Sequence, residues 1–86
     1  IYINLDQGWN MIGYTHNTAV QVENAFNSVI NNPALTSEFP IQIVKNVLGE
    51  FWQPEYNVNM LGNLLPGYGY LIYMNEELPD FSFSQN

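Results

Sequence analysis

The sequence predicts an α+β domain, with a small antiparallel or mixed sheet of about five strands and one amphipathic helix packed on a face. Several short segments alternate apolar and polar residues, and a single segment has helical spacing. A content of 47% hydrophobic and 15% aromatic residues supplies a core. Because 86 residues are too few for two cores, residues 1–86 are expected to form one module. The chain begins with Ile rather than Met, so we expect this module to belong to a longer or multidomain chain.

The N-terminal segment is expected to form a hairpin. Ile1, Ile3 and Leu5 alternate with polar positions, which is typical of a half-buried strand. Residues 6–8 have turn chemistry, and residues 9–15 form the second expected strand. The short connection favours direct pairing of the two strands.

One helix is expected between Thr18 and Asn31. Its apolar stripe consists of residues spaced i, i+3, i+4, i+7 and i+8, namely Val22, Ala25, Phe26, Val29 and Ile30. Thr18 and Gln21 resemble a capping box, and Asn31 precedes the Asn-Pro pair that ends the helix. Burial of the stripe makes Phe26→Asp an unfolding substitution.

The remaining strands follow in order. Residues 41–48 are apolar on both faces, which predicts a central strand, and residues 51–53 are its expected hairpin partner. Pro54 ends the pairing or marks an edge. Residues 55–65 are expected to be irregular, and the last elements are a strand over 68–74, an acidic loop over 75–80 and a short edge strand over 81–84.

Charge excludes several classes of partner. The chain has one cation, Lys45, against eight acidic residues, for a net charge of −7. Nucleic acid would be repelled, and anionic membrane surfaces are disfavoured. No apolar run approaches the ~18 residues of a spanning helix, so no membrane insertion is expected. With no cysteine, disulfides and thiolate chemistry are ruled out.

The aromatic residues are the candidate contact residues. Strand parity places Tyr68, Tyr70, Ile72 and Met74 on one face, and Leu71 and Tyr73 on the other. A role in the core, a protein interface and a carbohydrate site are all open, with the core favoured. For Trp9, a core position is favoured over a flat platform for a sugar ring. The candidates for interface or ligand contact are Tyr2, Trp9, Trp52, Tyr56, Tyr68, Tyr70 and Tyr73.

The lone cation is expected to have a structural role. Lys45 has the strand parity of Ile41 and Ile43, and Glu50 or Glu55 would be its ion-pair partner. A catalytic lysine is disfavoured because no second functional group lies beside it.

No enzyme, cofactor or metal is expected. His16 is alone in a turn and is interpreted as a solvated loop residue, since zinc requires several ligands. The acids of the 76–80 segment form a solvated rim or a weak calcium site, because no alternating calcium loop is present. No serine has a nucleophile-elbow motif.

Three phrases of the sequence resemble a known module. GWNMIGY, IVKNVLGEFWQPEYN and NMLGNLLPGYGYLIYM are similar, in this order, to a module of marine bacterial secreted proteins and of virion or tail-fibre proteins of marine phages and algal viruses. The resemblance covers roughly residues 5 to 74. It implies a surface or structural module without assigned catalytic residues. Residues 61–63 read Leu-Gly-Asn where that module has Gly-aliphatic-Gly-Asp, which removes the acid from this position.

The sequence therefore favours a non-enzymatic assembly or adhesion module of an extracellular, cell-surface or virion protein. An uncharged, Asn-rich surface beside many apolar residues predicts contact with other protein. Residues 1–5 and 81–84 carry no charged side chain that would block edge pairing, so a homo-oligomer or filament through these edges is expected, or contact with neighbouring domains. The alternative is a carbohydrate-binding module that uses exposed Trp and Tyr side chains on a glycan.

Overall fold

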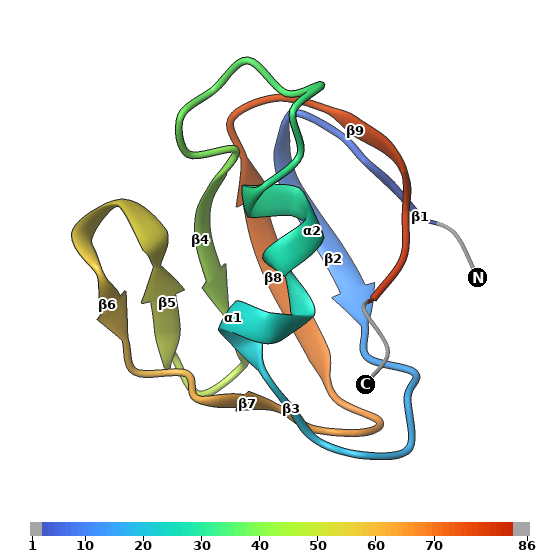
Figure 1. The fold of residues 1–86 in the computed structure, drawn as a ribbon. Coiled ribbons are helices and arrows are strands. Elements are labelled where there is room, and N and C mark those ends of the chain that lie inside the picture. Colours follow the sequence, from blue (N-terminus) through green and yellow to red (C-terminus); the bar gives the residue numbers. More distant parts are fainter. Residues whose placement is uncertain (1–2, 84–86) are drawn as a thin grey trace.

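A computed structural model describes residues 3–83 and shows a five-stranded antiparallel sheet, as the sequence predicts. Its order is β2-β8-β4-β5-β6, so β8, β4 and β5 are interior strands (Figure 1). The strands are β2 (Gly8–Gly13), β8 (Gly69–Met74), β4 (Ile41–Lys45), β5 (Phe51–Gln53) and β6 (Val58–Asn59).

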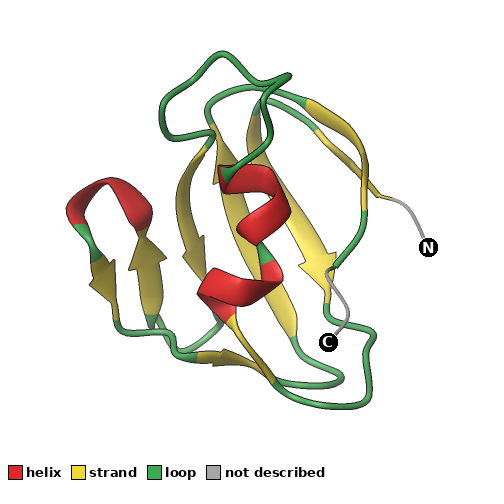
Figure 2. Ribbon diagram, in the orientation of Figure 1, coloured by secondary structure: helices red, strands yellow, loops and turns green. Residues whose placement is uncertain are grey.

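Two small ribbons and three short helical segments complete the described chain. The ribbons pair β1 (Ile3–Leu5) with β9 (Leu78–Phe81), and β3 (Val20–Gln21) with β7 (Asn63–Leu64). The helical segments are α1 (Val22–Ala25), α2 (Asn27–Ile30) and the 3₁₀ helix η1 (Pro54–Tyr56). Strands make up 41% and helices 14%, so the architecture is α+β or mainly β (Figure 2).

The core lies between the helices and one face of the sheet, here called the inner face (Figure 1). Phe26 is fully buried at its centre, where its ring stacks with Trp52 at 6.3 Å and with Phe81 at 5.4 Å between centroids. Phe83 meets the same ring edge-on at 5.7 Å. The β1–β9 ribbon therefore closes the core from the side opposite β5.

Strand β8 has the alternation that the sequence predicts. Tyr70, Ile72 and Met74 are buried on the inner face, whereas Leu71 and Tyr73 are partly exposed on the other, outer face. Tyr14 is also buried, and its hydroxyl donates a hydrogen bond to the carbonyl oxygen of Thr18 at 2.6 Å. Burial, with a smaller effect of the nearby Tyr70, raises the pKa of the Tyr14 phenol.

A β-bulge corrects the expected parity of β4. Ile41 pairs with Met74 and Ile43 pairs with Tyr73, so Gln42 is an extra residue on the β4 side. Ile41 consequently faces the core together with Val44, while Ile43 and Lys45 lie on the outer face. The predicted hairpin of β4 with β5 is confirmed, but it turns before Val47, so residues 46–48 are not strand.

The expected helix is present as two pieces. α1 and α2 are separated by Phe26, whose φ of −106° and ψ of 15° depart from helical values. The apolar stripe is buried as predicted at Val22, Ala25, Phe26 and Val29, and Ile30 is partly buried against the core. The predicted capping box is wrong, because Gln21 belongs to β3 and no side chain caps α1.

The predicted N-terminal hairpin is also wrong. β1 pairs with β9, and β2 pairs with β8. The side chain of Asn10 accepts a hydrogen bond from the Asp6 amide at 2.9 Å and donates one to the Asp6 carbonyl at 2.8 Å. It thus occupies the backbone groups with which β1 would begin to pair with β2.

The C-terminal segments also differ from expectation. Residues 78–81, placed partly in an acidic loop, form β9, and Ser84 lies outside the described residues. Because β1 and β9 pair with each other, they are not the two free strands on which edge-to-edge assembly was predicted. Residues 55–65, expected to be irregular, contain most of η1 together with β6 and β7.

Candidate interaction surface

The outer face of the sheet carries two rows of mostly apolar side chains. Cross-strand partners lie on the same face, so the register defines these rows. One row consists of Trp9, Tyr73 and Ile43, and the other of Met11, Leu71, Lys45 and Phe51. Trp9 is 53% and Met11 is 81% exposed. This sheet face therefore offers apolar surface to solvent.

The cation Lys45 lies within this apolar face. Its Nζ atom is 4.9 Å from the centroid of the Trp9 ring, and the Trp9 ring meets Tyr73 edge-on at 5.2 Å. A cation over an aromatic face contributes about 0.5–1 kcal/mol at an exposed site. The Trp9 indole therefore stabilises this position of the Lys45 ammonium group.

The expected ion pair is not seen among residues 3–83. Lys45 contacts Trp9, and the Glu50 carboxylate instead accepts a hydrogen bond from Asn46 Nδ2 at 2.8 Å. Glu55 is exposed on η1. Lys45 lies on the outer face and Glu50 in the β4–β5 turn, which explains why the sequence separation of five residues does not bring them together.

Two shallow hollows extend the apolar face around the β4–β5 turn. The first, of about 110 Å³, is lined by Met11, Leu71 and Val47, with Lys45 as its charged residue. The second, of about 160 Å³, is lined by Val47, Leu48, Leu65 and Tyr68, with Glu50 as its charged residue. Val47 belongs to both hollows, so the surface is continuous.

We call this surface the apolar band. Its exposed side chains are Trp9, Met11, Val47, Leu48, Leu65 and Tyr68, and Lys45 is the cation within it. Val47 and Leu48 are 84% and 80% exposed at the turn, so most of each side chain is open to solvent. Contiguous apolar surface of this kind is typical of contact sites.

The acidic residues lie away from the five-stranded sheet. None of the eight falls within β2, β8, β4, β5 or β6. Glu76 instead holds the loop before β4: its carboxylate accepts a hydrogen bond from the Ser37 amide at 2.5 Å. That hydrogen bond, with further ones from Ser37 and Thr36, lowers the pKa of Glu76.

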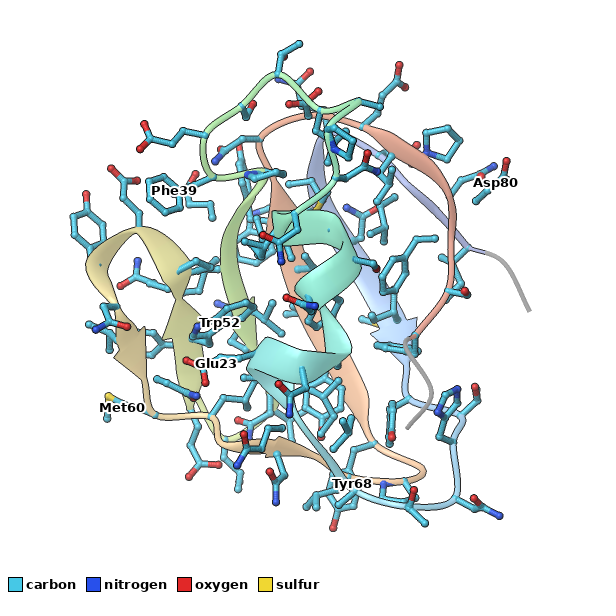
Figure 3. The ribbon with its side chains drawn as sticks, viewed as in Figure 1. Glu23, Phe39, Trp52, Met60, Tyr68 and Asp80 are labelled. Atoms are coloured by element: carbon cyan, nitrogen blue, oxygen red, sulfur yellow. The ribbon has the colours of Figure 1, made fainter. Side chains whose placement is uncertain are left out.

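The predicted aromatic candidates divide into exposed and buried groups. Trp52 and Tyr70 are only 5% and 3% exposed, and Figure 3 shows Trp52 beside the helices; Tyr70 also lines both hollows. Trp9 and Tyr68 are in the apolar band, with Tyr73 partly exposed beside Trp9. The core position favoured for Trp9 is wrong, because at its place in β2 it faces outward.

Two candidates lie elsewhere. Tyr56 is 67% exposed on η1, at the opposite edge of the sheet from β2. Tyr2 lies outside the described residues. Sequence reasoning missed Met11, Val47, Leu48 and Leu65, and for Val47 and Leu48 the Gly49-Glu50 turn that follows was the available signal.

The described residues contain no grouping of His, Cys, Asp or Glu side chains that could hold a metal ion. His16 is not fully solvated as expected, because it is partly buried against Tyr14 at 5.4 Å and Phe83 at 6.1 Å between ring centroids. Over residues 3–83, no helix has the length and hydrophobicity needed to cross a bilayer.

Comparisons of the chain with models of protein families, with curated proteins and with solved structures give no match.

Proposed function

We propose that this chain is a non-enzymatic assembly or adhesion module that binds protein through the apolar band. The observation that carries this proposal is the position of the exposed apolar side chains. Among residues 3–83, eight large apolar residues are exposed, and six of them belong to one surface, which includes the outer face of the sheet. Burying apolar surface contributes about 25 cal/mol per Å², so contact with a partner would be favourable.

Charge supports the same conclusion. A chain with a net charge of −7 repels its own copies, but the acids lie outside the five-stranded sheet. Contact through the apolar band therefore brings few carboxylates together. Aromatic and methionine side chains are also enriched at protein interfaces, and Trp9, Met11 and Tyr68 supply them here.

The test compares two substitutions of exposed methionines. Met11, in the apolar band, is 81% exposed, and Met60, outside it, is 62% exposed, so a charge at either site should leave the fold intact. We expect the native chain and Met60→Asp to self-associate with rising concentration, and Met11→Asp to remain monomeric in light scattering after size exclusion. Equal association of all three chains would contradict the proposal.

An extracellular, cell-surface or virion location is part of this proposal. It rests on the resemblance to surface modules of the phrases that contain Gly8–Gly13 and Pro66–Tyr70. Immunolabelling of the protein in its native host tests the location. Label confined to the cell interior would contradict it.

A carbohydrate-binding module is the second candidate, and the exposed Trp9 ring favours it. Tyr73 braces the indole edge-on and Lys45 lies over it, which leaves a fixed aromatic platform at one edge of the sheet. A glycan array probed with the native chain and with Trp9→Ala tests this function. Hits that disappear in the variant would support it, and an array without hits would exclude it for the glycans displayed.

A further inference from the structure

We propose that the occupant of the apolar band is the η1 tip of a second copy of this chain, which assembles head to tail. This inference rests on the proposed function and names its partner. The tip consists of Glu55 and Tyr56, both exposed at the edge of the sheet formed by β5 and β6.

The receiving site is the first hollow of the apolar band. Its volume of about 110 Å³ compares with ~30 Å³ per water molecule, which leaves room for one side chain and not for an extended ligand. Met11 and Leu71 line it, and Lys45 is its charged residue. Such a site suits an apolar side chain that has a carboxylate next to it.

The η1 tip presents these two groups. Outside the apolar band, the large apolar side chains that are exposed in residues 3–83 are Tyr56 and Met60. Of these, Tyr56 follows an exposed acid, Glu55. The tip is also preorganised, because the Asn57 amide donates to the Pro54 carbonyl at 3.1 Å and Asn57 closes the turn with a φ of 54°. A rigid tip loses little conformational freedom on docking.

The hollow and the η1 tip of one copy lie at opposite ends of β4. The hollow is formed by residues of β2 and β8 with the C-terminal end of β4, whereas η1 follows β5 and lies near the start of β4, because β4 and β5 are antiparallel. A contact between two different surfaces is heterologous, so it produces a closed ring or an open filament rather than a symmetric dimer.

Two exposed substitutions test this arrangement. Tyr56→Ser removes the tip and keeps the hollow, whereas Met11→Asp removes the hollow and keeps the tip. We expect each variant alone to be monomeric and their equimolar mixture to stop at a 1:1 dimer, because one tip and one hollow remain. Met60→Ser is the matched control for loss of an exposed apolar side chain, and it should assemble like the native chain.

A charge exchange provides a second test. Lys45→Glu and Glu55→Lys should each weaken association at least tenfold, and the double variant should recover it, since the two charges attract again. Circular dichroism establishes that each variant is folded. Recovery in the double variant distinguishes a direct contact from a structural effect of either substitution.

The outcomes separate this inference from the proposed function. Native-like assembly of Tyr56→Ser, together with loss of assembly in Met11→Asp, would overturn the tip as occupant and leave the apolar band as the contact surface. A monomeric native chain at every concentration would overturn both. A mixture of the two variants that polymerises would also contradict head-to-tail docking.

Discussion

At the scale of residues, the two tryptophans show how position decides the role of a side chain. Trp52 lies on the inner face of β5 and stacks on Phe26, and Trp9 lies on the outer face of β2 under the ammonium group of Lys45. Both follow a turn that contains a glycine, and both have a polar amide residue directly after them. Composition therefore supplies the aromatic content, and strand parity determines which rings meet solvent.

Phe26 is the residue on which the core depends most. It is fully buried and contacts three other aromatic rings, so Phe26→Ala should cost about 3–5 kcal/mol. A chain of 86 residues has a free energy of unfolding of about 4–13 kcal/mol, so this loss would be at least about a quarter of it. Urea titration followed by circular dichroism measures this. Ser28→Ala, at an exposed position of α2, is the control and should change stability by less than about 0.5 kcal/mol.

Residue patterns predict which side chains are buried better than they predict the route of the backbone. The parity of β8 and the helical stripe of residues 22–30 both follow from the repeat of apolar positions. The extra residue Gln42 does not, because a bulge changes parity without changing composition. Trp9 was misjudged for a similar reason: the alternation of its segment does not reveal which face the helices cover.

At the scale of elements, asparagine side chains make hydrogen bonds to backbone groups that would otherwise pair with another strand. Asn10 holds Asp6, and Asn46 accepts hydrogen bonds from the Leu48 and Glu50 amides at 3.0 and 3.1 Å. From the sequence, the asparagines are expected only as part of an uncharged surface. Their position at turns instead lets the amide satisfy backbone groups, as in Asx turns. This explains why the first two strands are adjacent in sequence but do not pair.

The loop that leads into β4 should loosen in acid. The Ser37 hydrogen bond lowers the pKa of Glu76 in the folded chain below its ordinary value of 4.5. Stability from this contact is therefore complete above pH 4.5 and is lost as the pH falls through the folded value. Glu76→Gln should reduce the acid sensitivity of the urea midpoint, measured at neutral pH and below 4.5. Glu77→Gln is the control for loss of a neighbouring charge, and an equal effect of both would contradict a specific role of Glu76.

At the scale of the whole molecule, apolar and charged surfaces are separated. The apolar band occupies the outer face and the β4–β5 turn, where Glu50 is the one acid, and the other acids occupy other loops, helices and the β1–β9 ribbon. Attraction through the band then competes with repulsion between copies that each carry a net charge of −7. Added salt shifts this balance toward association, because it screens the long-range repulsion between acids more than it weakens the apolar contact.

Association should therefore strengthen as salt is added. Between about 0.01 M and 0.15 M the screening length falls from ~30 Å to ~8 Å, which removes most of the repulsion between distant acids. We expect the dissociation constant for self-association to fall several-fold over this range in analytical ultracentrifugation. A rise would show that the contact of Lys45 with an acid outweighs the overall repulsion. Met11→Asp should remain monomeric at both salt concentrations.

The single cation also determines where trypsin can cut the chain. Trypsin cuts after Lys or Arg, and this sequence offers it one bond, Lys45–Asn46, at the end of β4. Because β4 is held between β8 and β5, that bond becomes accessible only when the middle of the sheet opens. Native chain should resist digestion, and the appearance of its two fragments should follow the unfolding seen by circular dichroism. Because there is one scissile bond, the rate of its cleavage measures how often the sheet opens in the native chain.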